Sequence, residues 1–468
     1  MARGKLLSRM VIALILCSFP FAFFGCSHDI IEPQPAIESI DYGGIDNIVY
    51  SKHIQPIWDQ KCNSSSCHNS IDRANGLDLT SWEALIRGSD FGENIISGNA
   101  ERSHLMEHIR GIATPRMPIG RDPLPDNVID FIDRWINEGA KNDAGERPYE
   151  GITQKAYVTN QGDDFISVIS TEFNLVTRLI PVGNSPALDV PHNIWVDNQN
   201  QFWYTTLIST GELWKFDVAT DSFQGKVNAG RSPANVVTSP DGQIVYVTNF
   251  DAFNGNFVQV INTATMQKIE ELQVGFAPHG INFSHDGQFI YITNYFSDSI
   301  SIIRADNHEE VDRVLLAEGL NPIRSTIYRP LQVVLTPDDR FAYVSCFGAG
   351  QVRVLDTITR TVIAVVTVGE GPFLLEITPD GKFVYVANLL SHNVSVIRVE
   401  DNQVAVTIEN ESFANPHGVA FSKDGRFAYI TNENLDGSFE AHHPTEGGGN
   451  PGNVQVVDTE TLEVIRTI

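Results

Sequence analysis

Two cysteines and a histidine stand close together near the start of the chain, in the order Cys62, Cys67, His68. Two thiols at short spacing can add across the vinyl groups of a porphyrin, while the adjoining imidazole ligates its iron. The usual motif has two residues between the thiols, whereas this one has four. The cluster predicts one covalently attached haem c, and a small disulfide loop is the alternative.

A methionine on a proline-rich loop offers the second iron ligand. Met117 lies 49 positions after His68 and directly before Pro118. A thioether fills the sixth coordination position and favours electron transfer over substrate binding. Met106 also lies in this region, but it falls in a helical apolar stripe where packing explains it better. We therefore expect His68 to be the proximal and Met117 the distal axial ligand.

The surrounding region, residues 46–145, has helical periodicity. It is clearest from Pro125 to Gly139, where the proline suits the first turn and the glycine the end of a helix. A domain of about 100 residues has a thin core unless a cofactor adds to it. We expect a small all-α domain built around the haem.

The order of short motifs in this region resembles a known family. Gly76-Leu77-Asp78-Leu79, Gly98-Asn99, Met117-Pro118 and Trp135-Ile136-Asn137-Glu138-Gly139-Ala140 follow one another as in the cytochrome c domains first defined in planctomycetes. The likeness covers residues 50 to about 143. It implies a monohaem electron-transfer domain.

From residue 154 the hydrophobic period changes to two and the chain repeats. A tetrapeptide of the type Tyr-Val-Thr-Asn recurs at intervals of 42 to 52 residues, beginning at Tyr157, Tyr204, Tyr246, Tyr291, Tyr343, Tyr385 and Tyr429. Most copies follow an Asp-Gly pair, which suits a tight hairpin turn. Four strands per unit at this period is typical of propeller blades. Residues 154–468 resemble the YVTN-type β-propeller family, a likeness that implies the fold and says little about activity.

The first and last units leave the closure of the ring open. No inner strand precedes Tyr157, and the chain stops after the outer strand of the last unit. We expect about seven four-stranded blades, with the first either incomplete or completed from residues near 146–155.

Six inner strands begin with proline, and in three of them a histidine follows, at His192, His279 and His417. Rotation about the propeller axis should bring these imidazoles to one mouth of the channel. They could bind a metal or a second cofactor there. Histidine as a tolerated residue of the repeat is the alternative.

The first 26 residues have the pattern of an export signal. Positive residues precede an apolar run from Met10 to Phe24, which Gly25-Cys26 closes. This ending resembles the lipobox of bacterial lipoproteins, in which Cys26 would carry the lipid. A plain secretory signal is the alternative.

The chain thus divides into five predicted segments: a lipoprotein signal peptide (1–26), a tether (27–45), a cytochrome c domain (46–145), a linker (146–153) and a YVTN-type propeller (154–468). Its net charge of −26 argues against nucleic acid as a partner, because phosphate binding needs a basic surface. The acidic excess serves solubility or forms a docking face for a basic partner.

Three functions fit these features. The first is an exported electron carrier, anchored by lipid in the periplasm or outer membrane, whose propeller docks periplasmic or membrane redox proteins. The second is a periplasmic oxidoreductase, superficially similar to haem cd1 nitrite reductases, with a second cofactor in the propeller. The third is a surface propeller that binds without catalysis. A carrier is favoured over an enzyme.

Overall fold

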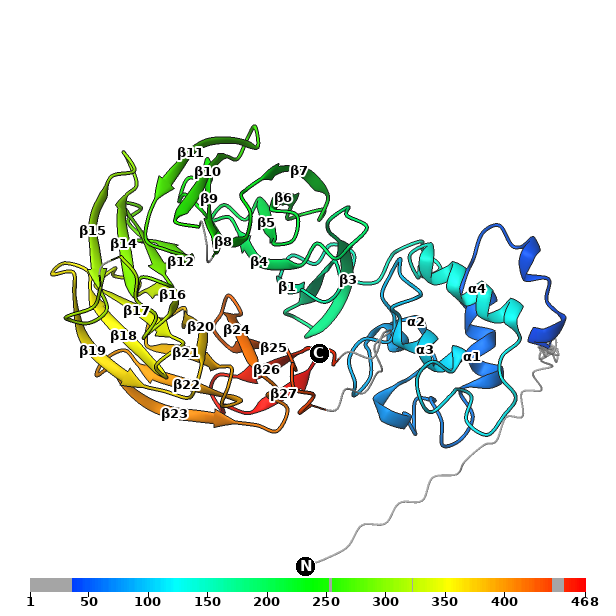
Figure 1. Cartoon of the computed structure of the whole chain (residues 1–468). Coiled ribbons are helices and arrows are strands. Elements are labelled where there is room, and N and C mark those ends of the chain that lie inside the picture. Colours follow the sequence, from blue (N-terminus) through cyan, green and yellow to red (C-terminus); the bar gives the residue numbers. More distant parts are fainter. Residues whose placement is uncertain (1–35, 252–254, 322, 440–449) are drawn as a thin grey trace, which may run out of the picture.

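The chain folds into a small helical domain followed by a ring of β-sheets (Figure 1). The computed structural model describes residues 36–251, 255–321, 323–439 and 450–468. The expected signal peptide with Cys26 and the first part of the expected tether lie outside the described residues. Among the described helices, none is long and apolar enough to cross a membrane. The predicted fold class is confirmed.

The described part of the first domain contains four α-helices and four short helical turns. They are η1 (Ile37–Ser39), η2 (Tyr42–Gly44), η3 (Tyr50–Ile54), α1 (Gln55–Lys61), η4 (Ala74–Gly76), α2 (Trp82–Ile86), α3 (His104–Arg110) and α4 (Asp126–Asn137). Helix α4 turns its apolar stripe inward. Its Phe131 and Trp135 are buried and contact the rings of Tyr42 and Tyr50, at centroid separations of 4.6 and 5.4 Å.

Residues 36–45 correct the predicted tether, because they belong to the helical domain. Ile37 and Tyr42 are buried in its core. The main-chain N–H of Ile37 donates to the Gln60 side chain at 3.2 Å, and Arg134 of α4 donates to the carbonyl of Ile45 at 2.6 Å. Burial of two large apolar side chains outweighs the extended tendency of the preceding proline-rich stretch.

Seven antiparallel sheets follow in chain order within the described residues and form the blades of the propeller (Figure 1). Blade 1 is β1 (Lys155–Asn160), β2 (Phe165–Ser170) and β3 (Leu175–Pro181); blade 2 is β4 (Pro191–Val196), β5 (Phe202–Leu207), β6 (Glu212–Asp217) and β7 (Phe223–Asn228); blade 3 is β8 (Pro233–Thr238), β9 (Ile244–Asn249), β10 (Phe257–Asn262) and β11 (Gln267–Gln273); blade 4 is β12 (Pro278–Phe283), β13 (Phe289–Asn294), β14 (Ser299–Arg304) and β15 (Glu310–Leu315). Blade 5 is β16 (Pro330–Leu335), β17 (Phe341–Cys346), β18 (Gln351–Asp356) and β19 (Thr361–Thr367); blade 6 is β20 (Pro372–Ile377), β21 (Phe383–Asn388), β22 (Asn393–Arg398) and β23 (Gln403–Glu409); blade 7 is β24 (Pro416–Phe421), β25 (Phe427–Asn432), β26 (Asn453–Asp458) and β27 (Val464–Thr467). Each of blades 2 to 7 thus begins at one of the six prolines noted in the sequence.

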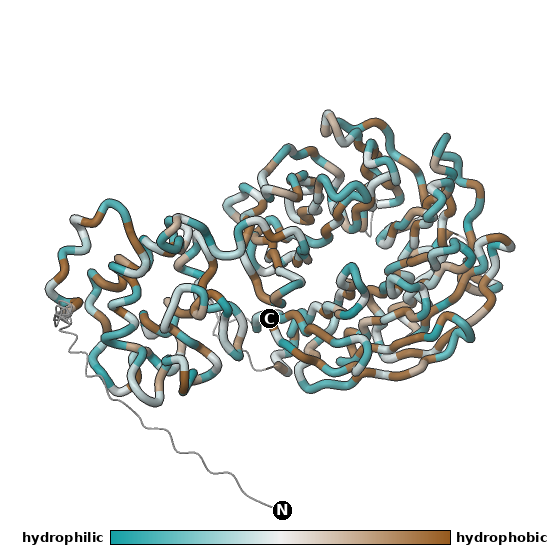
Figure 2. Tube along the Cα trace, turned by 180° about the vertical axis from the view of Figure 1, so that it is seen from behind, coloured by the Kyte–Doolittle hydropathy of each residue, from teal (hydrophilic) through white to brown (hydrophobic). Residues whose placement is uncertain are grey.

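The turns between the first two strands of blades 3 to 7 share one construction. In blade 3, the hydroxyl of Ser239 donates to the carboxylate of Asp241 at 2.6 Å, and Gly242 has a φ of 69°. Glycine tolerates that conformation without strain. Apolar segments recur between such polar turns along the whole trace (Figure 2). The Asp-Gly pairs therefore form the hairpin turns that the sequence predicts.

Among the described residues, blades 7 and 1 share no strand. Blade 1 has three described strands, and its first, β1, carries the repeat tyrosine that lies in the second strand of every other blade. Within the described ranges no innermost strand precedes β1, which is one of the two sequence alternatives. We call the contact between blades 7 and 1 the seam. There Tyr429 and Val456 of blade 7 pack against Ile169 and Val176 of blade 1.

A hydrogen bond from the repeat tyrosine links neighbouring blades, and the seam uses the same bond. The hydroxyls of Tyr157, Tyr246, Tyr343 and Tyr429 contact Asp221, His308, Asn402 and Asn174, each in the outer turn of the next blade around the ring. All four partners have positive φ values between 52° and 59°. At the seam, Tyr429 donates to Asn174 Oδ1 at 2.6 Å. The two ends of the propeller are therefore joined like two consecutive blades.

The helical domain packs against the seam, beside blade 1 and the C-terminal strand (Figure 1). Ile96 of the helical domain is buried among residues of both blades. Polar contacts surround it: Glu93 Oε2 accepts from the Val176 N–H at 3.2 Å, Arg466 donates to the Ser89 carbonyl at 3.2 Å, and Arg102 pairs with Asp163 at 2.8 Å. The helical domain thus bridges the two blades that must meet to close the ring.

Replacing Tyr429 with phenylalanine tests the bond across the seam. Tyr429→Phe should lower the free energy of unfolding by about 1 kcal/mol, because it removes one net hydrogen bond. Tyr385→Phe is the matched control, since the corresponding turn residue of the next blade is Leu462, which offers no side-chain acceptor. Urea unfolding followed by tryptophan fluorescence measures the free energy of unfolding of both variants. If Tyr429→Phe and Tyr385→Phe lowered it equally, the assigned role of the Tyr429 hydroxyl would be contradicted.

Glu93 should make the domain junction sensitive to pH. Burial raises the pKa of its carboxyl from 4.5 to about 7, opposed by hydrogen bonds from the Glu93 and Val176 main chain and by Arg466. The folded chain therefore holds this proton more tightly than the unfolded chain. Stability should fall by about 3 kcal/mol as the pH rises from 4.5 through 7, and should level off about one unit above the raised pKa. Denaturation midpoints across this range measure the effect.

Glu93→Gln should remove this contribution and leave that of Glu376, whose buried carboxyl also has its pKa raised to about 7, whereas substitution of the exposed Glu101 by glutamine should leave both. If the stability of Glu93→Gln fell with pH as much as that of the wild-type protein, the pH dependence would belong to another group.

Candidate functional site

The Cys62–His68 loop is a compact turn at the end of helix α1. The N–H of Cys62 donates to the Trp58 carbonyl at 2.8 Å and ends the helix. The N–H of His68 then donates back to the Cys62 carbonyl at 3.2 Å. The left-handed conformation of Ser66, with φ of 66°, makes this return possible. The spacing between the two cysteines is two residues longer than usual, and the turn accommodates this extra length. His68 therefore lies close to Cys62.

Both cysteines of this loop are free thiols. Cys62 packs against the core of the helical domain, and burial raises its pKa to about 12. The Cys67 sulfur accepts a hydrogen bond from the Ser64 hydroxyl at 3.3 Å. One thiol therefore faces the apolar interior and the other lies in the polar turn, and both are available to form thioether bonds.

His68 is held by its main chain, while Nδ1 of its ring is left without a hydrogen bond. Its carbonyl accepts from the Leu79 N–H at 2.8 Å. Its Nδ1 is buried and makes no hydrogen bond within the described residues. Burial lowers the pKa of the imidazole, although the nearby carbonyls of Ala74 and Leu77 oppose this. A neutral, buried imidazole is the form that ligates a metal ion.

The Met117 loop is tied to the C-terminal half of α3. The Met117 N–H donates to the His108 carbonyl at 2.9 Å, and His108 Nδ1 lies 2.8 Å from the Pro115 carbonyl oxygen. Met117 itself is half-buried. Met106 is fully buried in the core, so its predicted packing role is confirmed.

Two contacts place this loop near the cysteine turn. Arg121, four residues after Met117, donates to the Ser64 hydroxyl at 2.9 Å. His108 is close enough to His68 for its charge to lower the pKa of that imidazole. The structure therefore gathers the two cysteines, His68 and the Met117 loop in one region of the domain.

His108 is a residue that sequence reasoning missed. It lies one helical turn after His104, and the two rings are 5.4 Å apart. Its position directly before the Met117 loop was visible in the sequence, but its approach to His68 depends on how α3 folds back. His108 offers a second imidazole on the side of the Met117 loop.

The residues of this region fit a covalently bound haem. Two free thiols can form the thioether links, the unpartnered neutral imidazole of His68 can ligate the iron, and a thioether or an imidazole can approach the opposite face. The axial roles of His68 and Met117 stay predictions.

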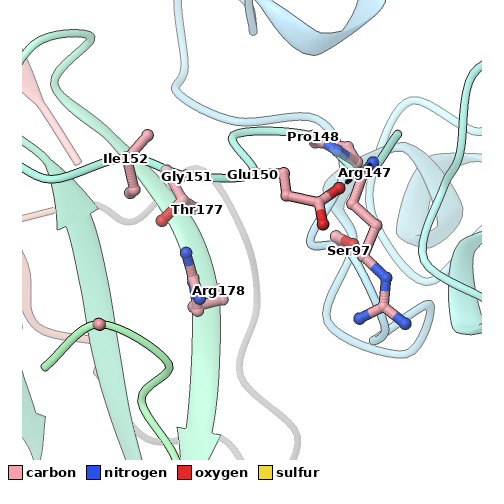
Figure 3. A pocket seen from close by; sticks show the side chains of 9 residues that line it. Ser97, Arg147, Pro148, Glu150, Gly151, Ile152, Thr177 and Arg178 are labelled. Atoms are coloured by element: carbon pink, nitrogen blue, oxygen red, sulfur yellow. Dashed lines mark hydrogen bonds between the residues drawn. The ribbon is translucent and has the colours of Figure 1, made fainter. Parts of the chain in front are cut away.

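A cavity of about 240 Å³ lies elsewhere, at the junction of the two domains (Figure 3). Ser97 and Arg147 line one side, and Thr177 and Arg178 of β3 line the other. Its lining includes neither cysteine of the turn nor any of the three propeller histidines.

The three propeller histidines stand at one mouth of the channel. His192, His279 and His417 occupy the second positions of the innermost strands β4, β12 and β24. The ring of His192 lies 5.8 Å from that of His279 and 6.3 Å from that of His417. The imidazoles therefore converge, although their blades are not adjacent. Their role as metal ligands stays a prediction.

Two families match separate parts of the chain. Residues 65–118 match the family Planctomycete cytochrome C, and residues 204–432 match the family Lactonase, 7-bladed beta-propeller. The first match contains Cys67, His68 and Met117 but begins after Cys62, at the point where the cysteine spacing is unusual.

Two curated proteins are similar over short segments. The uncharacterized protein YwhL of Bacillus subtilis (strain 168) is 32% identical over 106 residues, which cover 23% of this chain and 22% of that protein. Antigen Lp49 of Leptospira interrogans is 31% identical over 84 residues, covering 15% of this chain and 18% of that protein. The chain thus spans only about a fifth of the length of each relative.

Two solved structures share the propeller fold. A functionally unknown protein from Desulfotomaculum acetoxidans has a TM-score of 0.54 at 15% identity, covering 68% of this chain and 95% of the other. Hydrazine synthase of Kuenenia stuttgartiensis has a TM-score of 0.54 at 17% identity, covering 67% and 94%. At these identities the likeness concerns the fold alone. The chain therefore joins a helical region that is similar to Planctomycete cytochrome C to a seven-bladed β-propeller that is similar to the Lactonase family.

Proposed function

We propose that this haem-binding propeller protein is an exported electron carrier with one haem c attached to Cys62 and Cys67. The observation that carries the proposal is the single region that holds two free thiols, a buried neutral imidazole and the Met117 loop. A bound haem c would supply a one-electron redox couple there.

The side chains of the region have separate tasks in this proposal. The bond from the His68 N–H to the Cys62 carbonyl holds the imidazole beside both attachment points. The bond from Arg121 to Ser64 keeps the Met117 loop against the cysteine turn. A site with both axial positions filled favours electron transfer over the binding of substrate.

The propeller serves in this proposal as a docking platform. The chain carries 58 acidic and 32 basic side chains. Such an excess attracts basic partner proteins and speeds their association. Periplasmic or membrane redox proteins with basic surfaces are the proposed partners.

Export and anchoring rest on the N-terminal sequence. The proposed lipid-bearing residue, Cys26, lies outside the described residues. A lipid at this position would place the helical domain at the surface of a membrane in the cell envelope.

A periplasmic oxidoreductase is the second candidate. It is favoured by the convergence of His192, His279 and His417 in the channel, where a second redox centre could bind. Turnover with a small substrate would distinguish it from a carrier, which should show only reversible reduction and oxidation.

Removal of both thiols tests the haem attachment. The variant Cys62→Ala/Cys67→Ala, made in a host able to attach haem c, should lose essentially all covalent haem. Cys346→Ala is the matched control, because its buried thiol lies in the propeller. A pyridine haemochrome assay and mass spectrometry of intact protein measure the outcome. A colourless wild-type protein would remove the basis of the proposal.

Replacement of Met117 tests the distal ligand. Met117→Leu should abolish the sulfur-to-iron charge-transfer band and lower the reduction potential, because a thioether ligand raises it. Met106→Leu controls for loss of a methionine in the same domain. Optical spectroscopy with potentiometric titration measures both properties. If His108→Ala alters the spectrum while Met117→Leu does not, His108 is the sixth ligand.

A further inference from the structure

Three histidines occupy a position that the propeller repeat does not reserve for histidine. The second residues of the innermost strands of blades 2 to 7 are His192, Ala234, His279, Leu331, Phe373 and His417. Alanine, leucine and phenylalanine form the same strand equally well. The strand itself therefore does not explain the histidines.

The spacing of the rings suits a shared metal ion. The centres of the His192 and His279 rings are 5.8 Å apart with an interplanar angle of 85°, and those of His192 and His417 are 6.3 Å apart at 80°. Two imidazoles bound to one Zn²⁺ through bonds of about 2.0–2.1 Å have ring centres about 5–6 Å apart. The two measured separations are close to that range.

Hydrogen bonds orient two of the imidazoles. The Gln161 amide Nε2 lies 3.2 Å from His192 Nδ1. His279 Nδ1 lies 3.0 Å from the Leu331 carbonyl oxygen, so Nδ1–H donates and Nε2 keeps its lone pair. An outer-shell hydrogen bond of this kind fixes the orientation of a metal-binding histidine.

A carboxylate stands beside the cluster. Glu433 Oε1 lies 3.4 Å from His417 Nε2. Phe373 and Phe250 border the imidazoles, with ring centres 4.1 Å from His417 and 5.1 Å from His279. The aromatic border restricts water around the polar centre.

We propose that His192, His279 and His417, together with Glu433, bind one divalent transition-metal ion at this mouth of the channel. In the described part of the chain, no group of three such side chains is already in ligating geometry. Binding therefore includes rotation of the His417 ring from its contact with Glu433 toward the other two imidazoles. The site is independent of the proposed haem, which belongs to the helical domain.

Zinc is the probe for this proposal. Untagged, full-length protein carrying its haem is freed of other metals with a chelator and titrated with ZnCl₂ in a calorimeter. Zinc retained after gel filtration is then measured by elemental analysis. The wild-type protein should bind about one equivalent of zinc, with Zn–N distances of about 2.0–2.1 Å by X-ray absorption. Bound zinc should also raise the thermal midpoint.

Variants of the cluster assign the ligands. His279→Gln and His192→Gln should each weaken zinc binding about 10-fold or more, and the triple variant with His417→Gln should abolish it. His285→Gln is the matched control, because that side chain is 52% exposed and pairs with Asp339 at the surface. Haem content and the thermal midpoint in chelator show whether each variant folds.

Zinc binding that survives in His279→Gln and His192→Gln, or that falls equally in His285→Gln, would overturn the proposal. So would a folded wild-type protein that binds no zinc. Haem content reports separately on the electron-carrier proposal: a colourless protein that still binds zinc would refute the carrier and leave this site intact.

Discussion

A ring of blades is stable only if its first and last members meet, and a tyrosine hydrogen bond found between several blades also joins these two. In four blades the tyrosine hydroxyl reaches the outer turn of the next blade, and across the seam Tyr429 does so with Asn174. Among the described residues blades 7 and 1 share no strand, and apolar side chains pack beside this bond. The domain that carries the candidate haem site packs over this seam and buries Ile96 in it.

The candidate haem site also depends on a small number of hydrogen bonds. A four-residue spacing between the cysteines would move His68 away from the first thiol if the loop were extended. The bond between the His68 N–H and the Cys62 carbonyl, with Ser66 in a left-handed conformation, returns the imidazole to its place. The bond from Arg121 to Ser64 then ties the Met117 loop to the same turn. Few hydrogen bonds therefore bring together groups that are far apart in the sequence.

The sequence predicts the features that depend on its repeats and on short linear motifs. The tyrosine period gives the seven blades, the six prolines mark the inner strands, and rotational symmetry places His192, His279 and His417 at one mouth. Features that depend on long-range packing are not predictable in this way. Ile37 and Tyr42 join the helical core although their neighbours look like a tether, and His108 approaches His68 only after α3 folds back. The spacing of the imidazoles also required the structure, because their distance depends on where the ring closes.

A joint bridged by a second domain has a topological consequence. Blades 7 and 1 could separate without breaking the ladder of any described sheet. The helical domain, however, contacts blade 1 through Glu93 and blade 7 through Ser89 and Arg466, so it would have to leave one of them first. Loss of the helical domain's fold would therefore remove a support of the joint as well as the candidate haem site.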